Sequence, residues 1–212
     1  MTPLTTSARK RVMPRTLPLV AGSVSRAQLL LVAAGACGDD GGDEGLPPGD
    51  DQGIEEVFQR FFDPLGLEFT YGSVVDLEGG KHLALYVEPT GPATDEQYLE
   101  RLVSSAAAVI PYLFDAYPGL HSFDICQEPV PTGPDDPPQP DPRTVVQLTR
   151  EQAGTVADWS TATLTDLITA ARTGEGGEVR VDAAIARLPG YVDARARADA
   201  DPPPTTRARR SY

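Results

Sequence analysis

The chain has 212 residues but few of the side chains that most often carry chemistry: two histidines, two cysteines and a single tryptophan. It also lacks the common catalytic signatures, namely the G-x-S-x-G turn, the phosphate-binding P-loop, the H-E-x-x-H zinc motif, the C-x-x-C pair and the glycine-rich dinucleotide fingerprint. Zinc and similar metals are held mainly by histidine and cysteine. We therefore expect no cofactor, no metal site of this kind and no enzyme of these classes.

No hydrophobic run is long enough to cross a membrane. The most apolar segment, Ala27 to Ala36, has ten residues, whereas a membrane-spanning helix needs about 20. Five basic residues and no acidic residue precede this segment, and small residues followed by Cys37 end it. Basic, apolar and small residues in this order are typical of an export signal. The sequence therefore predicts a signal peptide over residues 1–36, with Met13 as an alternative start.

The residues at the expected cleavage point are Ala34, Gly35, Ala36 and Cys37. This segment resembles the signal of a bacterial lipoprotein, in which a short apolar stretch leads to small residues and a cysteine that becomes the acylated N-terminus. The resemblance implies cleavage between Ala36 and Cys37, lipidation of Cys37, and a membrane-anchored protein outside the cytoplasm. Position 34 departs from the family pattern, where Leu or Val is commoner. Because Ala34-Gly35-Ala36 also fits ordinary signal cleavage, a secreted form without lipid stays open.

The two cysteines leave two alternatives for Cys126. If Cys37 carries lipid, Cys126 is a lone thiol in an oxidising compartment, and if Cys37 is not acylated, the two can form a Cys37–Cys126 disulfide. A reactive thiol needs a basic neighbourhood, but Asp124 and Glu128 lie on either side of Cys126 in the sequence. We expect Cys126 to be a small, half-buried strand residue without chemistry.

Positive charge is scarce, since 18 Lys and Arg stand against 31 Asp and Glu, a formal net charge of −13. Five of the basic residues lie in the predicted signal, so the exported chain carries 13 basic and 31 acidic residues, or −18. Such a chain repels nucleic acid and anionic surfaces, and we expect no nucleic-acid partner. Residues 37–53 are rich in Gly and Asp and poor in apolar residues, which predicts a solvated acidic tether.

The folded part is expected to begin with a helix over 54–62 and a β-hairpin. Leu67, Phe69, Tyr71, Val75 and Leu77 share one parity, which predicts a strand with these side chains buried. Gly79-Gly80 then forms the turn to a return strand. The apolar face of the return strand is predicted to hold Leu83, Leu85 and Val87, with His82 on the opposite, more solvated face.

The strongest pattern is a helix over Thr94 to Tyr117, with a wide apolar stripe and a capping box formed by Thr94 and Gln97. Pro111 lies inside it, so we expect a kink near Ala107 to Pro111.

A third strand is predicted over Leu120 to Gln127, with Phe123 and Ile125 facing inward. His121 shares the inward parity at the rim of the core. Its neighbour Ser122 faces the other way, so this adjacent pair cannot act as nucleophile and base.

Residues 128–142 contain seven prolines, which predicts an extended loop without core residues. A strand at 143–149 and a helix ending near Arg172 follow, with Trp159 as a lid on the core. A weaker helix is expected over 181–198, and a disordered tail over 199–212.

Together these elements predict an α+β fold: a two-layer domain with an antiparallel sheet of about four strands in the order α-β-β-α-β-β-α, and helices packed on one face. We expect one domain over residues 54–198, and a monomer.

For function, the sequence favours a membrane-anchored cell-envelope lipoprotein that acts as a non-enzymatic binding module. Its contact with an envelope protein or a cell-wall component is expected on the exposed sheet face or the 128–142 loop. One alternative is an anchored hydrolase using carboxylates of the first hairpin: Glu68, Asp76, Glu78 and Glu88. The other is a sensor of a small ligand or cation.

Overall fold

The computed structural model describes residues 45–77, 79–130 and 141–200. The predicted signal peptide and Cys37 lie outside the described residues, as do residues 131–140 of the proline-rich loop and the predicted tail beyond residue 200. The elements follow the chain in this order: α1 (Asp51–Phe62), η1 (Asp63–Leu65), β1 (Leu67–Leu77), β2 (Gly80–Pro89), α2 (Asp95–Ala116), β3 (Leu120–Gln127), β4 (Thr144–Thr149), α3 (Arg150–Ala153), η2 (Trp159–Thr161), α4 (Leu164–Ala171), β5 (Glu178–Val181), η3 (Ile185–Arg187) and α5 (Pro189–Ala200).

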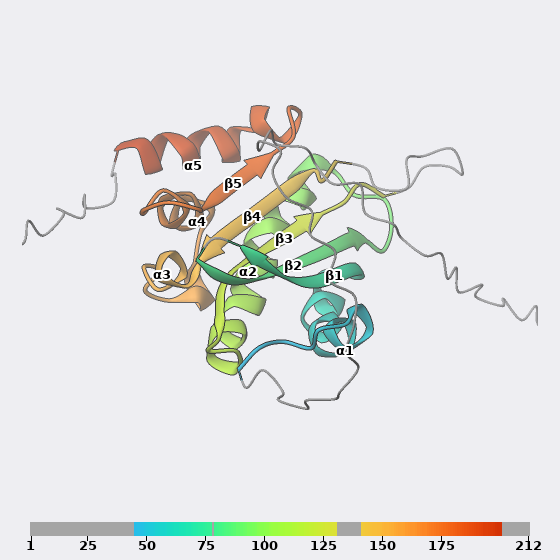
Figure 1. The fold of residues 1–212 in the computed structure, drawn as a ribbon. Helices are drawn as coiled ribbons and strands as arrows, with labels where there is room; N and C mark the ends of the chain where they lie inside the picture. The colour runs from blue at the N-terminus through green and yellow to red at the C-terminus, as the bar shows by residue number, and fades with distance from the viewer. Residues whose placement is uncertain (1–44, 78, 131–140, 201–212) are drawn as a thin grey trace, which may run out of the picture. The chain divides into compact units, whose positions relative to one another are not determined.

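The strands form one five-stranded sheet in the order β1-β2-β3-β4-β5 (Figure 1). The predicted α+β class is confirmed, but the prediction of about four antiparallel strands is wrong in two respects. First, β2 and β3 are parallel, because the connection through α2 carries the chain back to the same end of the sheet. Second, β5 adds an edge strand whose four residues are too few for a period-2 pattern to stand out in the sequence.

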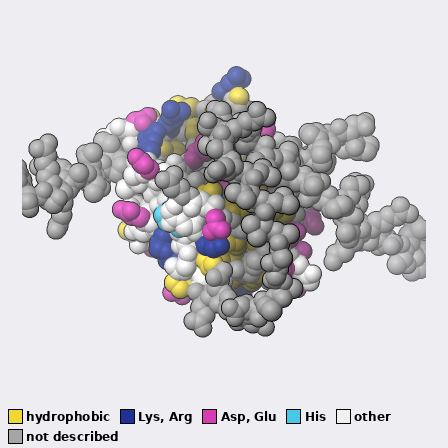
Figure 2. All heavy atoms as spheres, viewed as in Figure 1, with side chains coloured by type: hydrophobic (Ala, Val, Ile, Leu, Met, Phe, Trp, Pro, Cys, Tyr) yellow, Lys and Arg dark blue, Asp and Glu magenta, His cyan; other side chains and the backbone are white. Residues whose placement is uncertain are grey.

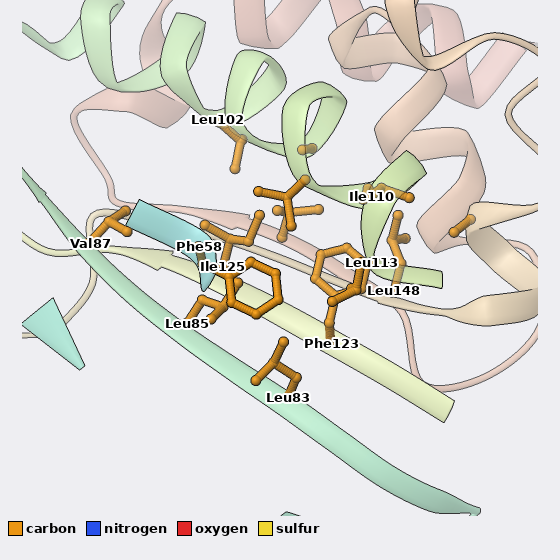
Figure 3. Packing of buried hydrophobic residues seen from close by; sticks show 14 of the residues in the cluster. Phe58, Leu83, Leu85, Val87, Leu102, Ile110, Leu113, Phe123, Ile125 and Leu148 are labelled. Carbon is orange, nitrogen blue, oxygen red and sulfur yellow. The ribbon is translucent and has the colours of Figure 1, made fainter. Parts of the chain in front are cut away.

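One hydrophobic core joins the helices to one face of the sheet. Figure 3 shows Leu83, Leu85, Phe123 and Ile125 reaching from β2 and β3 toward α2. The predicted inward faces of these two strands are confirmed, because all four side chains are buried. The same cluster includes buried residues of α1 and α4, so these helices cover the same face as α2. Trp159, the predicted lid, is half-buried against this cluster.

The burial predicted for β1 is correct only in its first half. Leu67 and Phe69 are buried, but the register against β2 shifts between Phe69 and Tyr71, a β-bulge. Since one extra residue reverses the parity of everything after it, Val75 and Leu77 turn outward and are 41% and 48% exposed.

The inward position after the bulge falls to Gly72, which lies beneath α1. A Cβ built there lies 2.6 Å from Ile54 Cγ2 and 2.7 Å from Phe69 Cζ, so this close approach of helix and strand requires glycine.

Side chains of α1 also close part of the open edge of β1. The Gln59 amide accepts from the Phe69 N–H at 2.7 Å and donates to the Leu67 carbonyl at 3.3 Å, as a neighbouring strand would. Asp51 accepts from the Gly72 N–H at 2.7 Å. This part of the edge is therefore satisfied without another strand.

The long helix forms as predicted. The Thr94 hydroxyl accepts from the Gln97 N–H, and the Gln97 side chain accepts from the Thr94 N–H at 2.9 Å, which completes the capping box. The helix continues through Pro111 to Ala116. Among the residues that the structure describes, neither this helix nor any other combines the length and the apolar character needed to span a bilayer.

Candidate functional site

A groove of about 410 Å³ runs between α2, the start of α4 and the start of α5. Its lining is largely apolar and combines Leu99 and Val103 of α2 with residues that follow far later in the chain: Leu164, Leu188, Pro189 and Gly190. A volume of this size lies within the range of about 300–1,000 Å³ that is typical of ligand sites. We call this feature the α2 groove.

One wall of the α2 groove follows directly from the helical period. Glu96, Leu99, Glu100 and Val103 are spaced i, i+3, i+4 and i+7, so they form a single stripe along α2. Tyr98 and Leu102, on the neighbouring face, are buried. The apolar surface of α2 is thus wider than the part that the sheet covers. Leu99 and Val103 lie at the side of the helix and are only half-buried.

An arginine connects the two walls of the α2 groove. Arg143, just before β4, donates from Nη2 to Asp95 Oδ1 at 2.7 Å and from Nε to Asp182 Oδ2 at 2.6 Å. Its guanidinium lies 4.5 Å from the centre of the Tyr98 ring. Asp95 opens α2 and Asp182 leads into η3, so this contact fixes the start of one wall relative to the segment that reaches Leu188.

Asp182 is held in its charged form by its neighbours. Burial alone raises the pKa of this carboxyl, but hydrogen bonds from the Ile185 N–H and from Arg143 outweigh the burial and leave the pKa below its ordinary value. The contact between Arg143 and Asp182 is therefore an ion pair at neutral pH.

The rim of the groove carries two carboxylates, Glu96 and Glu100, one turn apart on α2. Both residues are exposed, and neither carboxylate has an ion-pair partner among residues 45–77, 79–130 and 141–200. The groove therefore presents an apolar floor beside unpaired negative charge.

A second polar feature lies on the other face of the sheet. His82 Nδ1 and Ser122 Oγ are 2.9 Å apart, and His82 Nε2 lies 3.4 Å from Asp124 Oδ2. The prediction that His82 lies on a solvated face is wrong, because its side chain is buried between these two residues of β3. The parallel pairing of β2 with β3 places Ser122 beside His82, a contact across 40 residues of chain that no local pattern reports.

The set of Ser122, His82 and Asp124 has the residue types of a hydrolase triad but not its surroundings. Ser122 is 3% exposed, so its hydroxyl is closed to a substrate. A triad needs backbone N–H donors for the developing oxyanion, and β3 is an interior strand paired on both sides. The set therefore fits a structural hydrogen-bond network in the sheet.

His121, the other histidine, lies away from this set. The register between β2 and β3 shifts at His121, and its imidazole packs over the turn, where a Cβ on Gly79 would lie 2.9 Å from Nε2. Ser122 lies instead against His82, with Ser122 Oγ 2.9 Å from His82 Nδ1. The same shift explains why the adjacent Leu120 is also buried.

Cys126 is a free cysteine that is buried in β3. Burial first, and the nearby Asp124 carboxylate second, raise the pKa of its thiol well above the ordinary range. The thiol is therefore protonated and a poor nucleophile at neutral pH, as expected from its acidic neighbours. It is more deeply buried than the predicted half-buried residue.

The carboxylates proposed for a hydrolase are only partly brought together. Glu68 and Glu88 are directly opposed in the β1–β2 register, whereas Asp76 is paired with Lys81 at 3.0 Å. Glu78 lies outside the described residues. Within the described ranges, no three His, Cys, Asp or Glu side chains are grouped so as to hold a metal ion. On the face shown in Figure 2, the visible acidic side chains are scattered, with basic ones among them.

The α2 groove was not anticipated from the sequence, which indicated α2 as a core helix alone. The available signal was the width of its apolar stripe together with Glu96 and Glu100 at the stripe's border. The predicted lipidation and cleavage residues, Ala36 and Cys37, lie outside the described residues and remain predictions.

Comparison of the chain with protein-family models, with curated proteins and with solved structures found no match in any of the three.

Proposed function

We propose that this protein is a membrane-tethered binding module of the cell envelope, and that it contacts another envelope protein through the α2 groove. The observation that carries the proposal is the combination of an apolar floor with two exposed carboxylates, those of Glu96 and Glu100, on its rim. Apolar side chains left half-exposed beside charged residues are typical of recognition surfaces.

This proposal replaces the sheet face and the proline-rich loop as the first choice for the contact. On the sheet face, His82 and Ser122 are buried and lie within hydrogen-bond distance of each other, with the Asp124 carboxylate beside His82, so this polar group is already occupied internally. Residues 131–140 of the loop lie outside the described residues. The loop therefore stays an alternative contact, and replacing 131–140 with a Gly/Ser linker of equal length tests it.

Tethering rests on the lipoprotein-like segment around Cys37. We expect the exported chain to begin at Cys37, to carry the mass of attached acyl chains and to partition into detergent. A Cys37→Ala variant is expected in the aqueous phase. A native product that retains the initiating methionine and stays in the aqueous phase would contradict the tethering proposal.

Site-specific photocrosslinking in intact cells tests the groove. A photoreactive residue replaces Val103, which lines the groove, and the matched control replaces Val75, an exposed valine on β1. We expect a defined crosslinked protein from position 103 and none from position 75. Crosslinks from position 75 alone would place the contact on the sheet face instead, and no protein crosslink from either position would refute a protein-binding role.

A further inference from the structure

We infer that the occupant of the α2 groove is an amphipathic helix of a partner protein, with apolar anchors and basic residues one turn apart. This inference rests on the proposed function and gives the chemistry of its partner. The inference follows from three properties of the α2 groove: the shape of its α2 wall, its apolar floor and the charge on its rim.

The shape of the wall favours a helical partner. The stripe from Glu96 to Val103 runs along α2 for about 10 Å at a rise of about 1.5 Å per residue. Leu164 and the segment from Leu188 to Gly190 form the facing wall. A groove that lies between helices and follows one helix axis matches another helix, whose side chains at i, i+3 and i+4 lie along the same line.

The apolar floor and the charged rim of the groove indicate which side chains the partner helix carries. Leu99, Val103, Leu164 and Leu188 are half-buried, so burying them further against apolar anchors is favourable. Glu96 and Glu100 are neighbours on one helix face, about 5–6 Å apart between their Cβ atoms. Two Lys or Arg residues spaced by one turn on the partner match this separation.

Charge argues against two other occupants. A second copy of this chain, with a net charge of −13 before export, would bring further negative charge to the rim. A lipid chain would fill the apolar floor but leave both carboxylates without a counter-charge. The chain's own C-terminal residues include Arg207, Arg209 and Arg210, and this alternative is an outcome of the test below.

The experiment uses the full exported chain with Cys37→Ala and two synthetic helical peptides. Both peptides carry leucine at i, i+3, i+4 and i+7; one has lysines and the other glutamates at the flanking positions. Fluorescence anisotropy is expected to show saturable binding of the basic peptide, weakened by salt, and no binding of the acidic one.

A charge-swap variant makes the test specific to the rim. Glu96→Lys with Glu100→Lys is expected to weaken basic-peptide binding by at least about tenfold, since two attractions become repulsions, and to gain binding of the acidic peptide. The control is Glu55→Lys with Glu56→Lys, an equal change of charge at exposed positions of α1 outside the groove. Circular dichroism verifies that both variants are folded.

Three patterns of peptide binding would overturn the inference, and so would the failure of both peptides to bind. The first is equal binding of the two peptides, as expected of an apolar ligand site that ignores charge. The second is an equal loss of basic-peptide binding in the α1 control, which would show that the effect comes from net charge alone. The third is basic-peptide binding only after residues 201–212 are deleted, which would make the chain's own end the occupant. If the peptides fail but crosslinking at Val103 persists, the binding module stands and this partner chemistry falls.

Discussion

Replacing Arg143 with methionine tests how the two walls of the α2 groove are held together. Methionine is similar to the unbranched aliphatic part of arginine but has no guanidinium. The change therefore removes the hydrogen bonds to Asp95 and Asp182, at 2.7 Å and 2.6 Å, and the guanidinium contact with the Tyr98 ring. It also leaves two carboxylates close together without their shared counter-charge.

The expected loss follows from the burial of these groups. A hydrogen bond to a charged group contributes about 1.5–3 kcal/mol, whereas an exposed ion pair contributes about 0–1 kcal/mol. Arg143 is 20% exposed, but the side chains of Asp95 and Asp182 are 36% and 30% exposed and regain water when the arginine is removed. We therefore expect Arg143→Met to lower the free energy of unfolding by about 2 kcal/mol at pH 7.

The pH dependence has a definite sign. The pKa of Asp182 is lowered in the folded protein, so the stability it contributes is present above the unfolded pKa of about 3.9 and is lost as pH falls through the lower folded value. The difference between wild type and Arg143→Met is therefore expected to shrink between pH 5 and pH 3.

Urea unfolding followed by Trp159 fluorescence measures both effects. Arg180→Met is the matched control, since Arg180 is exposed and its ion pair within the described part of the chain is the long one to Glu178, at 3.6 Å, and it should change stability by no more than about 0.5 kcal/mol. An Arg143→Met protein as stable as the control at pH 7, or a difference that is unchanged at pH 3, would refute the reasoning.

Three further predictions concern the sheet. Gly72→Ala should lower the free energy of unfolding, measured in urea, by about 1–3 kcal/mol, because its Cβ overlaps core atoms. Val75→Thr should change it by no more than about 0.5 kcal/mol. A larger loss for Val75→Thr than for Gly72→Ala would contradict the position of the β1 bulge. Ser122→Ala should cost about 1–3 kcal/mol by leaving buried His82 without this partner, and a neutral result would show that the contact is not formed. The thiol of Cys126 should resist a disulfide reagent until the protein unfolds, and rapid labelling of the native protein would contradict its burial.

The helices could be predicted because their signals are local. Thr94 and Gln97 form the capping box that their spacing indicates, and the apolar period of α1 and α2 marks the sides that are buried. Alternation likewise placed Leu83, Leu85, Phe123 and Ile125 inward. These features depend on residues that are close together in the sequence.

Features that depend on distant residues could not be predicted. The bulge after Phe69 shifts the pairing of β1 with β2 and places Gly72 beneath α1, so alternation alone assigned Val75 to the wrong face. His82 finds Ser122 across a parallel pairing that α2 creates. The sequence cannot show which strand becomes a neighbour until the direction of the crossover is known.

The groove illustrates the same limit for function. Its α2 wall can be read from the stripe that starts at Glu96, but its other wall comes from Leu164 and Leu188, more than sixty residues later. Only the packing of α4 and α5 beside α2 turns a wide apolar stripe into a groove.

Methyl NMR of the full exported chain, titrated with the partner segment recovered by crosslinking at Val103, tests the central claim most directly. The methyl signals of Leu99, Val103, Leu164 and Leu188 are expected to shift together and to saturate at one stoichiometry, while those of Val75 and Leu77 stay in place. Shifts confined to Val75 and Leu77, with the groove signals unmoved, would contradict the assignment of the α2 groove as the binding site.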